Sequence, residues 1–120
     1  MQSFHDVIHD LRQSTRALRA AIPETWSAFS ELNRSAMADG ALPGRIKELM
    51  ALVLAVADGC DGCIGYHARA AAYKGASEPE VAEALGVALL MAGGPASVDG
   101  PRAFAAFRDF QAAVPVGAVG

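Results

Sequence analysis

The chain has 120 residues, a length that accommodates one domain and leaves no room for a second hydrophobic core. Hydrophobic residues make up 52% and charged residues 19%, proportions that exclude an intrinsically disordered chain. The net charge of −3 provides no general attraction to nucleic acid or anionic membranes, so neither is expected as a partner. The best apolar run, residues 49–57, is shorter than the roughly 20 residues of a membrane-spanning helix.

Apolar residues recur at helical spacing along most of the chain, and no convincing strand pattern is found. Six helices are predicted in chain order, over residues 4–21, 24–38, 45–57, 60–74, 77–91 and 102–113. The third is apolar nearly all round, so we expect it to lie at the centre of the fold. Ser77 and Glu80 have the spacing of a capping box, which predicts the start of the fifth helix.

Glycine and proline define the expected connections. Asp58 and Gly59 end the third helix, and residues 93–101, which begin Gly-Gly-Pro and end at Pro101, are predicted to form a loop. Residues 115–120 are expected to fray. The fold class predicted is therefore all-α, a single-domain bundle of about six helices that uses residues 1–120 as one domain.

The size and composition of the subunit also predict its assembly and its cellular compartment. A subunit this small and apolar is expected to bury hydrophobic surface against further copies of itself. Residues 1–6 lack the basic and apolar regions of a signal peptide, so a cytoplasmic location is expected. In that compartment two cysteines rarely form a structural disulfide. These two, Cys60 and Cys63, lie three residues apart.

The segment between Glu48 and His67 carries the most informative pattern. Cys60 and Cys63 form a C-x-x-C motif at the start of a predicted helix, where unpaired N–H groups and the helix dipole favour a thiolate. His67 follows Cys63 by four residues and therefore shares its helix face. Glu48 lies on the preceding helix, and an antiparallel return of the chain would bring it towards His67. A carboxylate there would fix the imidazole tautomer.

Each of these residues also has a simpler interpretation. The two cysteines suit a helix core as small buried residues, and Glu48 alone suits an ion-paired surface glutamate. Cys60, Cys63 and His67, with Glu48 as a fourth ligand, are acceptable zinc ligands. Structural zinc sites usually take two ligand pairs, and no second Cys/His pair exists here, so neither metal nor cofactor is expected.

Two patterns on the first predicted helix are interpreted as surface. His5 and His9 have an i, i+4 spacing that suits a metal, but no supporting carboxylate is obvious, so a solvated face is favoured. A basic stripe could take an anionic partner, but the negative net charge favours a solvated or subunit-facing surface. Its members are Arg12, Arg16 and Arg19.

Glu48, Cys60, Cys63 and His67 together resemble the core of the alkylhydroperoxidase D family, part of the carboxymuconolactone decarboxylase-like superfamily. The twelve-residue step from Glu48 to Cys60 is kept, and the resemblance covers roughly residues 24–107. It implies an all-helical, alkylhydroperoxidase D-like subunit that assembles as a homotrimer or homohexamer. It also implies a thiol-dependent antioxidant enzyme that reduces hydroperoxides or a partner's disulfide.

The resemblance also assigns roles to the matching residues. Cys63 is the peroxidatic cysteine that becomes a sulfenic acid, and Cys60 is the proton donor that then resolves it to a disulfide. His67 and Glu48 form the proton relay. From the residues alone the order is open, because a helix N-terminus favours Cys60 and the i, i+4 histidine favours Cys63. Some members imply a lipoyl-linked reductant or a peroxiredoxin partner.

One residue departs from the family pattern. Its best-known members carry a histidine immediately before the second cysteine, where this chain has Gly62, and the missing imidazole predicts weaker activation of the thiol. Two other functions stay open: a decarboxylase that acts on a small lactone, and a non-catalytic helical oligomer whose cysteines sense redox state or hold a metal. A Cys63→Ser variant distinguishes all three.

Overall fold

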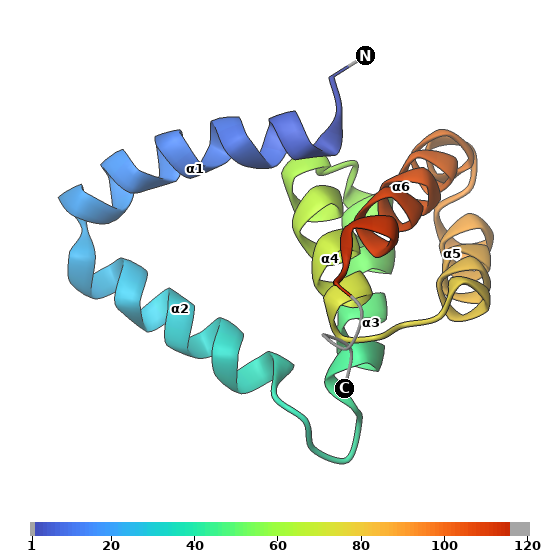
Figure 1. Cartoon of the computed structure of the whole chain (residues 1–120), viewed down its shortest axis with the longest axis horizontal. Helices are drawn as coiled ribbons and strands as arrows, with labels where there is room; N and C mark the ends of the chain where they lie inside the picture. The colour runs from blue at the N-terminus through green and yellow to red at the C-terminus, as the bar shows by residue number, and fades with distance from the viewer. Residues whose placement is uncertain (1, 116–120) are drawn as a thin grey trace.

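The structure, a computed structural model, describes residues 2–115, and every regular element in that range is a helix (Figure 1). The helices are α1 (Phe4–Ala21), α2 (Pro23–Met37), α3 (Gly44–Asp58), α4 (Asp61–Tyr73), α5 (Glu78–Ala92) and α6 (Gly94–Ala113). The all-α prediction is confirmed, and the bounds of the first five helices fall within one residue of those predicted. In this described part, no helix is long and apolar enough to cross a membrane. Most of the tail predicted to fray, residues 116–120, lies outside the described residues.

Local sequence signals account for several helix ends. The Ser3 hydroxyl caps α1 by accepting the Asp6 N–H at 3.2 Å. Ser77 and Glu80 form the predicted capping box at the start of α5, where each side chain accepts the other residue's backbone N–H. α3 ends at Gly59, whose φ of 68° is the left-handed conformation that glycine adopts without steric cost.

The predicted loop at residues 93–101 is wrong, because α6 begins at Gly94 and runs through it. Pro95 falls in the first turn, where the missing N–H has no intrahelical partner. Pro101 removes one hydrogen bond inside the helix. Small and aromatic residues at helical spacing hold this segment against the core and outweigh that loss. They are Ala96, Gly100, Ala103 and Phe107, all buried.

The hydrophobic core lies among α3, α4, α5 and α6, which pack against one another as a bundle (Figure 1). Its largest fully buried side chains are Phe107, Leu52, Ile64, Val56 and Val81. α3 contacts the other three helices of the bundle, as expected of a central helix. Its opposite face is nevertheless open to solvent in the single chain, since Met50 and Leu54 are exposed.

α1 and α2 form an arm that extends away from this bundle (Figure 1). The first half of α1 is docked on α4 because Gly65 allows close approach: a Cβ there would lie 3.3 Å from both Ile8 and Phe4. α2 has no buried residue, and its apolar positions Phe29 and Leu32 are exposed. The arm therefore leaves an apolar helix face without a partner in the single chain.

Candidate active site

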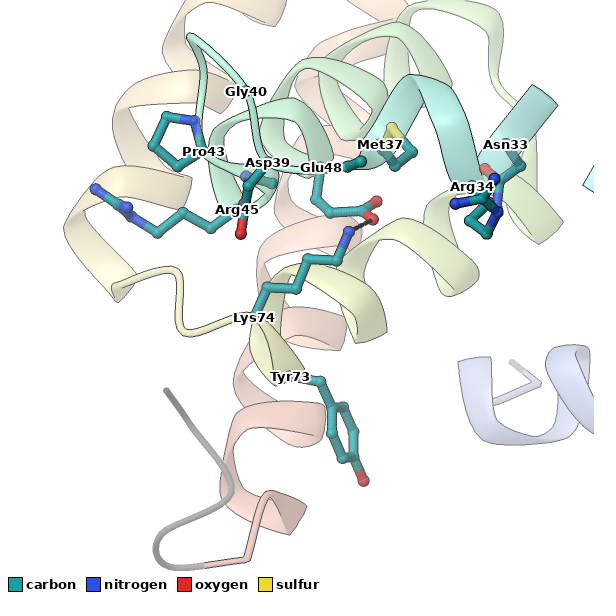
Figure 2. Close-up of a pocket in the computed structure, with 12 residues that line it drawn as sticks. Asn33, Arg34, Met37, Asp39, Gly40, Pro43, Arg45, Glu48, Tyr73 and Lys74 are labelled. Atoms are coloured by element: carbon teal, nitrogen blue, oxygen red, sulfur yellow. Dashed lines mark hydrogen bonds and ion pairs between the residues drawn. The ribbon is translucent and has the colours of Figure 1, made fainter. Parts of the chain in front are cut away.

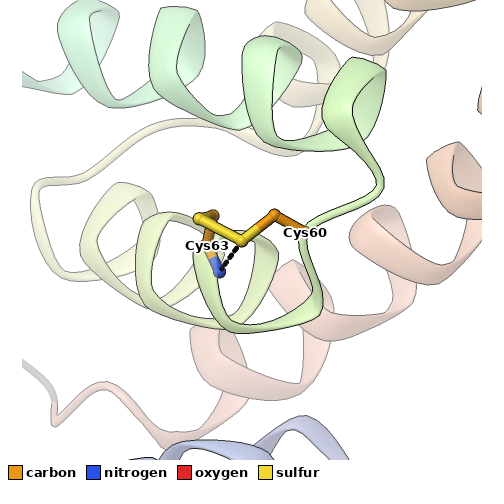
Figure 3. The surroundings of a disulfide bond; sticks show 2 residues. All are labelled: Cys60 and Cys63. Atoms are coloured by element: carbon orange, nitrogen blue, oxygen red, sulfur yellow. Dashed lines mark hydrogen bonds between the residues drawn. A yellow bond between two sulfur atoms is a disulfide. The ribbon is translucent and has the colours of Figure 1, made fainter. Parts of the chain in front are cut away.

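The tight turn between α3 and α4 positions the two cysteines at the start of α4. Cys60 is the N-cap residue, and its Sγ accepts the backbone N–H of Cys63 at 3.2 Å (Figure 3). The two cysteines are joined as a disulfide, with Cα atoms 5.2 Å apart. Cys63 is exposed, whereas Cys60 is half-buried. The motif is thus accessible from solvent at a helix N-terminus, where negative charge on sulfur is stabilised.

Glu48 and His67 are in direct contact. α4 returns antiparallel to α3, and this brings Nδ1 of His67 to 2.8 Å from Oε1 of Glu48. Glu48 is 4% exposed and is the buried charged residue of the core, while His67 is half-buried. The antiparallel return expected from the sequence therefore makes this contact without an intervening water.

Lys74 also contacts Glu48, and Glu48, His67 and Lys74 together form the Glu48 cluster. The sequence pattern does not predict that Lys74 belongs to it. Nζ of Lys74 donates to Oε2 of Glu48 at 2.8 Å (Figure 2). Because Oε1 of the same carboxylate contacts His67, Glu48 bridges the lysine and the histidine. A signal was available: Lys74 follows His67 by seven residues, two helical turns, and so lies on the same face of the chain's helical path. By itself, however, the sequence pattern indicates only that a predicted helix ends at this lysine.

The environment of Glu48 keeps its carboxylate ionised. Burial by itself would raise the pKa of Glu48, but hydrogen bonds from His67 and Lys74, together with the Lys74 charge, outweigh burial and lower it. An ionised carboxylate can only accept hydrogen bonds, so Nδ1 of His67 carries the proton that is donated to Oε1. In the neutral imidazole the other ring nitrogen, Nε2, then carries no proton and can act as a base.

An open pocket of about 850 Å³ lies beside this cluster, where the end of α2 and the following loop face α3 and α4 (Figure 2). Glu48 and Lys74 contribute to its wall, together with Met37 and Tyr73. Neither cysteine is among its lining residues, and His67 is not either. The pocket therefore reaches the carboxylate end of the cluster, while the disulfide lies at the surface turn.

The structure gives a physical reason for Gly62, the departure from the family pattern. A Cβ at this position would lie 2.7 Å from Cδ1 of Leu11, because α1 crosses α4 there. Leu11 thus fills the space that any larger side chain would enter. A histidine would require α1 or the Leu11 side chain to move. The close packing of α1 on α4 therefore depends on a glycine at this position.

The residues weighed as metal ligands make other contacts in the structure. Within residues 2–115 no group of three or more His, Cys, Asp or Glu side chains is placed to hold a metal ion. On α1, the His5 ring lies 4.5 Å from the ring of Phe110, and His9 contacts Gln13. The predicted set of Glu48, Cys60, Cys63 and His67 is instead divided between a disulfide and a hydrogen-bonded pair.

Comparisons with known proteins agree with this fold. The chain is 38% identical to a carboxymuconolactone decarboxylase family protein from Legionella pneumophila, whose apo crystal structure superposes with a TM-score of 0.87 over 90% of this chain and 96% of that one. It is 37% identical to an uncharacterized protein of Cupriavidus necator over 82% of this chain and 87% of the relative. It is also 35% identical to uncharacterized protein 4 in the cox locus of Paracoccus denitrificans, over 72% of this chain and 78% of the relative.

A family model supplies the assignment. The model of the carboxymuconolactone decarboxylase family matches residues 23–109, a span that includes α2 to α5 and nearly all of α6, and hence the cysteine pair and the Glu48 cluster. The chain belongs to the carboxymuconolactone decarboxylase family.

Proposed function

We propose that this protein is a thiol-dependent antioxidant enzyme of the alkylhydroperoxidase type, which reduces hydroperoxides through Cys60 and Cys63. One observation carries the proposal: a C-x-x-C disulfide at a helix N-terminus stands one turn before a histidine held by a buried carboxylate. This arrangement supplies a nucleophile, a base and a group that orients the base. Family membership supports it, because the family includes alkylhydroperoxidase D-like members.

The first step oxidises Cys63. His67 Nε2 takes the proton of the Cys63 thiol, and the thiolate attacks one peroxide oxygen. The S–O bond forms as the O–O bond breaks, and the departing alkoxide takes a proton from Cys60. The products are a Cys63 sulfenic acid and an alcohol. The exposed position of Cys63 supports its assignment as the residue that meets the peroxide.

The second step closes the disulfide. The Cys60 thiolate attacks the Cys63 sulfur, and the S–O bond breaks as the S–S bond forms. The departing hydroxide takes the proton held by His67 and leaves as water. The N-cap position of Cys60 supports this role, because the helix terminus stabilises the attacking thiolate. The sum is two thiols and one hydroperoxide giving a disulfide, an alcohol and water.

A dithiol reductant must return two electrons and two protons to complete the cycle. A lipoyl-linked dithiol or a peroxiredoxin partner would exchange with the disulfide through the exposed Cys63 sulfur. If the substrate is a partner protein's disulfide instead of a peroxide, Cys60 and Cys63 react with it by thiol–disulfide exchange. We place this chemistry in the cytoplasm, because a disulfide that must be reduced in each cycle needs a reducing compartment.

We further propose that the enzyme works as a homotrimer or homohexamer. Exposed apolar side chains on three helices support self-association. They are Phe29 and Leu32 on α2, Met50 and Leu54 on α3, and Val87, Leu90 and Met91 on α5. α2, which buries no residue against its own bundle and exposes apolar side chains, suits contact with a second copy.

The proposal is tested by turnover. Reduced protein with dihydrolipoamide should consume cumene hydroperoxide, and Cys63→Ser should reduce the rate to that of the Cys60→Ser, Cys63→Ser double variant. A wild-type rate no faster than the double variant would contradict the proposal. Decarboxylation of a small lactone that survives in Cys63→Ser would identify the decarboxylase alternative, and thiols that oxidise without turnover would identify the redox sensor.

A further inference from the structure

A second pocket, of about 320 Å³, lies between α1, α4 and α6 and is separate from the cysteine site. Its walls carry two arginines, Arg12 from α1 and Arg69 from α4, and none of its described lining residues is acidic. Within residues 2–115 neither guanidinium has an ion-pair partner, whereas Arg45 and Arg102 each pair with a carboxylate. The pocket therefore concentrates positive charge in a chain whose net charge is −3.

Further polar groups and an apolar floor complete this pocket. His5 and His9 line it from α1, and Tyr73 lines it from α4. Its floor includes Phe110, which is buried and packs against the His5 ring at 4.5 Å. The Arg69 guanidinium lies 5.2 Å from the Tyr73 ring centroid, a stacking contact that restricts its rotamers.

The pocket and the cysteine site use different sides of α4. Arg69 comes two residues after His67, and residues two apart on a helix point to nearly opposite sides. Arg69 faces the side on which Gly62 and Gly65 pack against α1. A ligand in this pocket would accordingly bind without contact to the disulfide.

We propose that this pocket binds one small organic anion, a carboxylate with an apolar body. A guanidinium group binds a carboxylate through two-pronged hydrogen bonds, and the imidazoles and the phenol in the pocket wall add further donors. The apolar part of the ligand would lie against Ile8 and Phe110, which are both buried in the floor. A volume of about 320 Å³ suits a single compact molecule.

Benzoate is the probe, because it combines one carboxylate with a compact apolar ring. The chain contains three histidines, of which His5 and His9 line the pocket and His67 belongs to the cysteine site. Proton NMR should show saturable shifts of the His5 and His9 ring signals on titration with benzoate at constant ionic strength. The His67 signal should stay in place, which makes this result independent of the proposed peroxidase activity.

Matched double variants test the arginines. Arg12→Gln with Arg69→Gln should weaken benzoate binding at least tenfold, whereas Arg16→Gln with Arg19→Gln should leave it within twofold. The control removes the same charge, in this case entirely from α1, at two positions outside the pocket. Circular dichroism of each variant verifies the helical fold, and Tyr73→Phe serves as a milder pocket variant. Absence of saturable binding, or equal losses in both double variants, would overturn the proposal.

Discussion

Replacing Lys74 with methionine tests whether the lysine holds Glu48 ionised beside His67. Methionine retains a long, unbranched side chain but removes the ammonium group. Oε2 of Glu48 would lose its 2.8 Å hydrogen bond, and the buried carboxylate would keep the contact with His67. The variant therefore leaves the negative charge of Glu48 in the core with one of its two hydrogen-bond partners removed.

The expected cost follows from burial on the two sides of the pair. Breaking a fully buried ion pair costs about 3–5 kcal/mol, and a hydrogen bond to a charged group contributes about 1.5–3 kcal/mol. The side chain of Glu48 is 5% exposed, but that of Lys74 is 37% exposed, so solvent screens part of the attraction. We expect Lys74→Met to lower the free energy of unfolding by about 1–2 kcal/mol at pH 7.

The pH dependence of this loss has a definite sign. The pKa of Glu48 is lower in the folded protein than its ordinary value of 4.5, because the His67 and Lys74 interactions outweigh burial. The stability that this shift contributes is present above the unfolded-state pKa and is lost as pH falls through the lower folded-state pKa. The difference between wild type and variant should therefore be full at pH 7 and shrink once the pH falls below 4.5.

Urea unfolding followed by helical circular dichroism, at one fixed protein concentration, measures this difference at each pH. Arg34→Met is the matched control, because Arg34 pairs with Glu31 at the surface. The Arg34 side chain is 72% exposed and the Glu31 side chain is 65% exposed. The control should cost under about 0.5 kcal/mol. A Lys74→Met loss no larger than the control, or one unchanged between pH 7 and acid, would refute the reasoning.

Three further changes should follow from the same geometry. Glu48→Gln should slow peroxide-driven disulfide closure at least about tenfold in stopped-flow assays, because the amide no longer fixes the His67 tautomer; a wild-type rate would exclude the relay. Gly62→His should undock α1 by displacing Leu11, so limited proteolysis should cut residues 4–21 faster than in Gly62→Ala; equal rates would contradict this. Leu90→Asp, at a position 80% exposed on α5, should lower the assembly mass in light scattering, and a monomeric wild type would exclude the oligomer.

The sequence was sufficient for the helices whose ends carry capping signals. α5 begins at the predicted capping box and α3 ends at Gly59, and the bounds follow within one residue. The start of α6 is not evident from the sequence, because Pro95 and Pro101 favour a loop. Proline is compatible with a first turn, and the buried face through Ala96 and Phe107 decides the rest. That burial depends on tertiary packing, which the positions of glycine and proline in the sequence do not reveal.

The spacing of the site residues predicted the contact between Glu48 and His67, because two antiparallel helices joined by a short turn bring these positions together. It did not predict Lys74, because a lysine near a helix end is ordinarily solvated. Its pairing depends on the buried position of Glu48 across the interface between α3 and α4. The meaning of Gly62 was also hidden, because the neighbour that requires a glycine, Leu11, is fifty-one residues away in the sequence.

The intact mass of fully reduced protein, measured after one equivalent of hydroperoxide, tests the central claim most directly. The account predicts rapid loss of two hydrogens as Cys60 and Cys63 close to the disulfide. Cys60→Ser should instead stop at a Cys63 sulfenic acid, one oxygen heavier, and Cys63→Ser should remain unchanged. A wild-type mass that stays constant, with both thiols still free, would contradict the account.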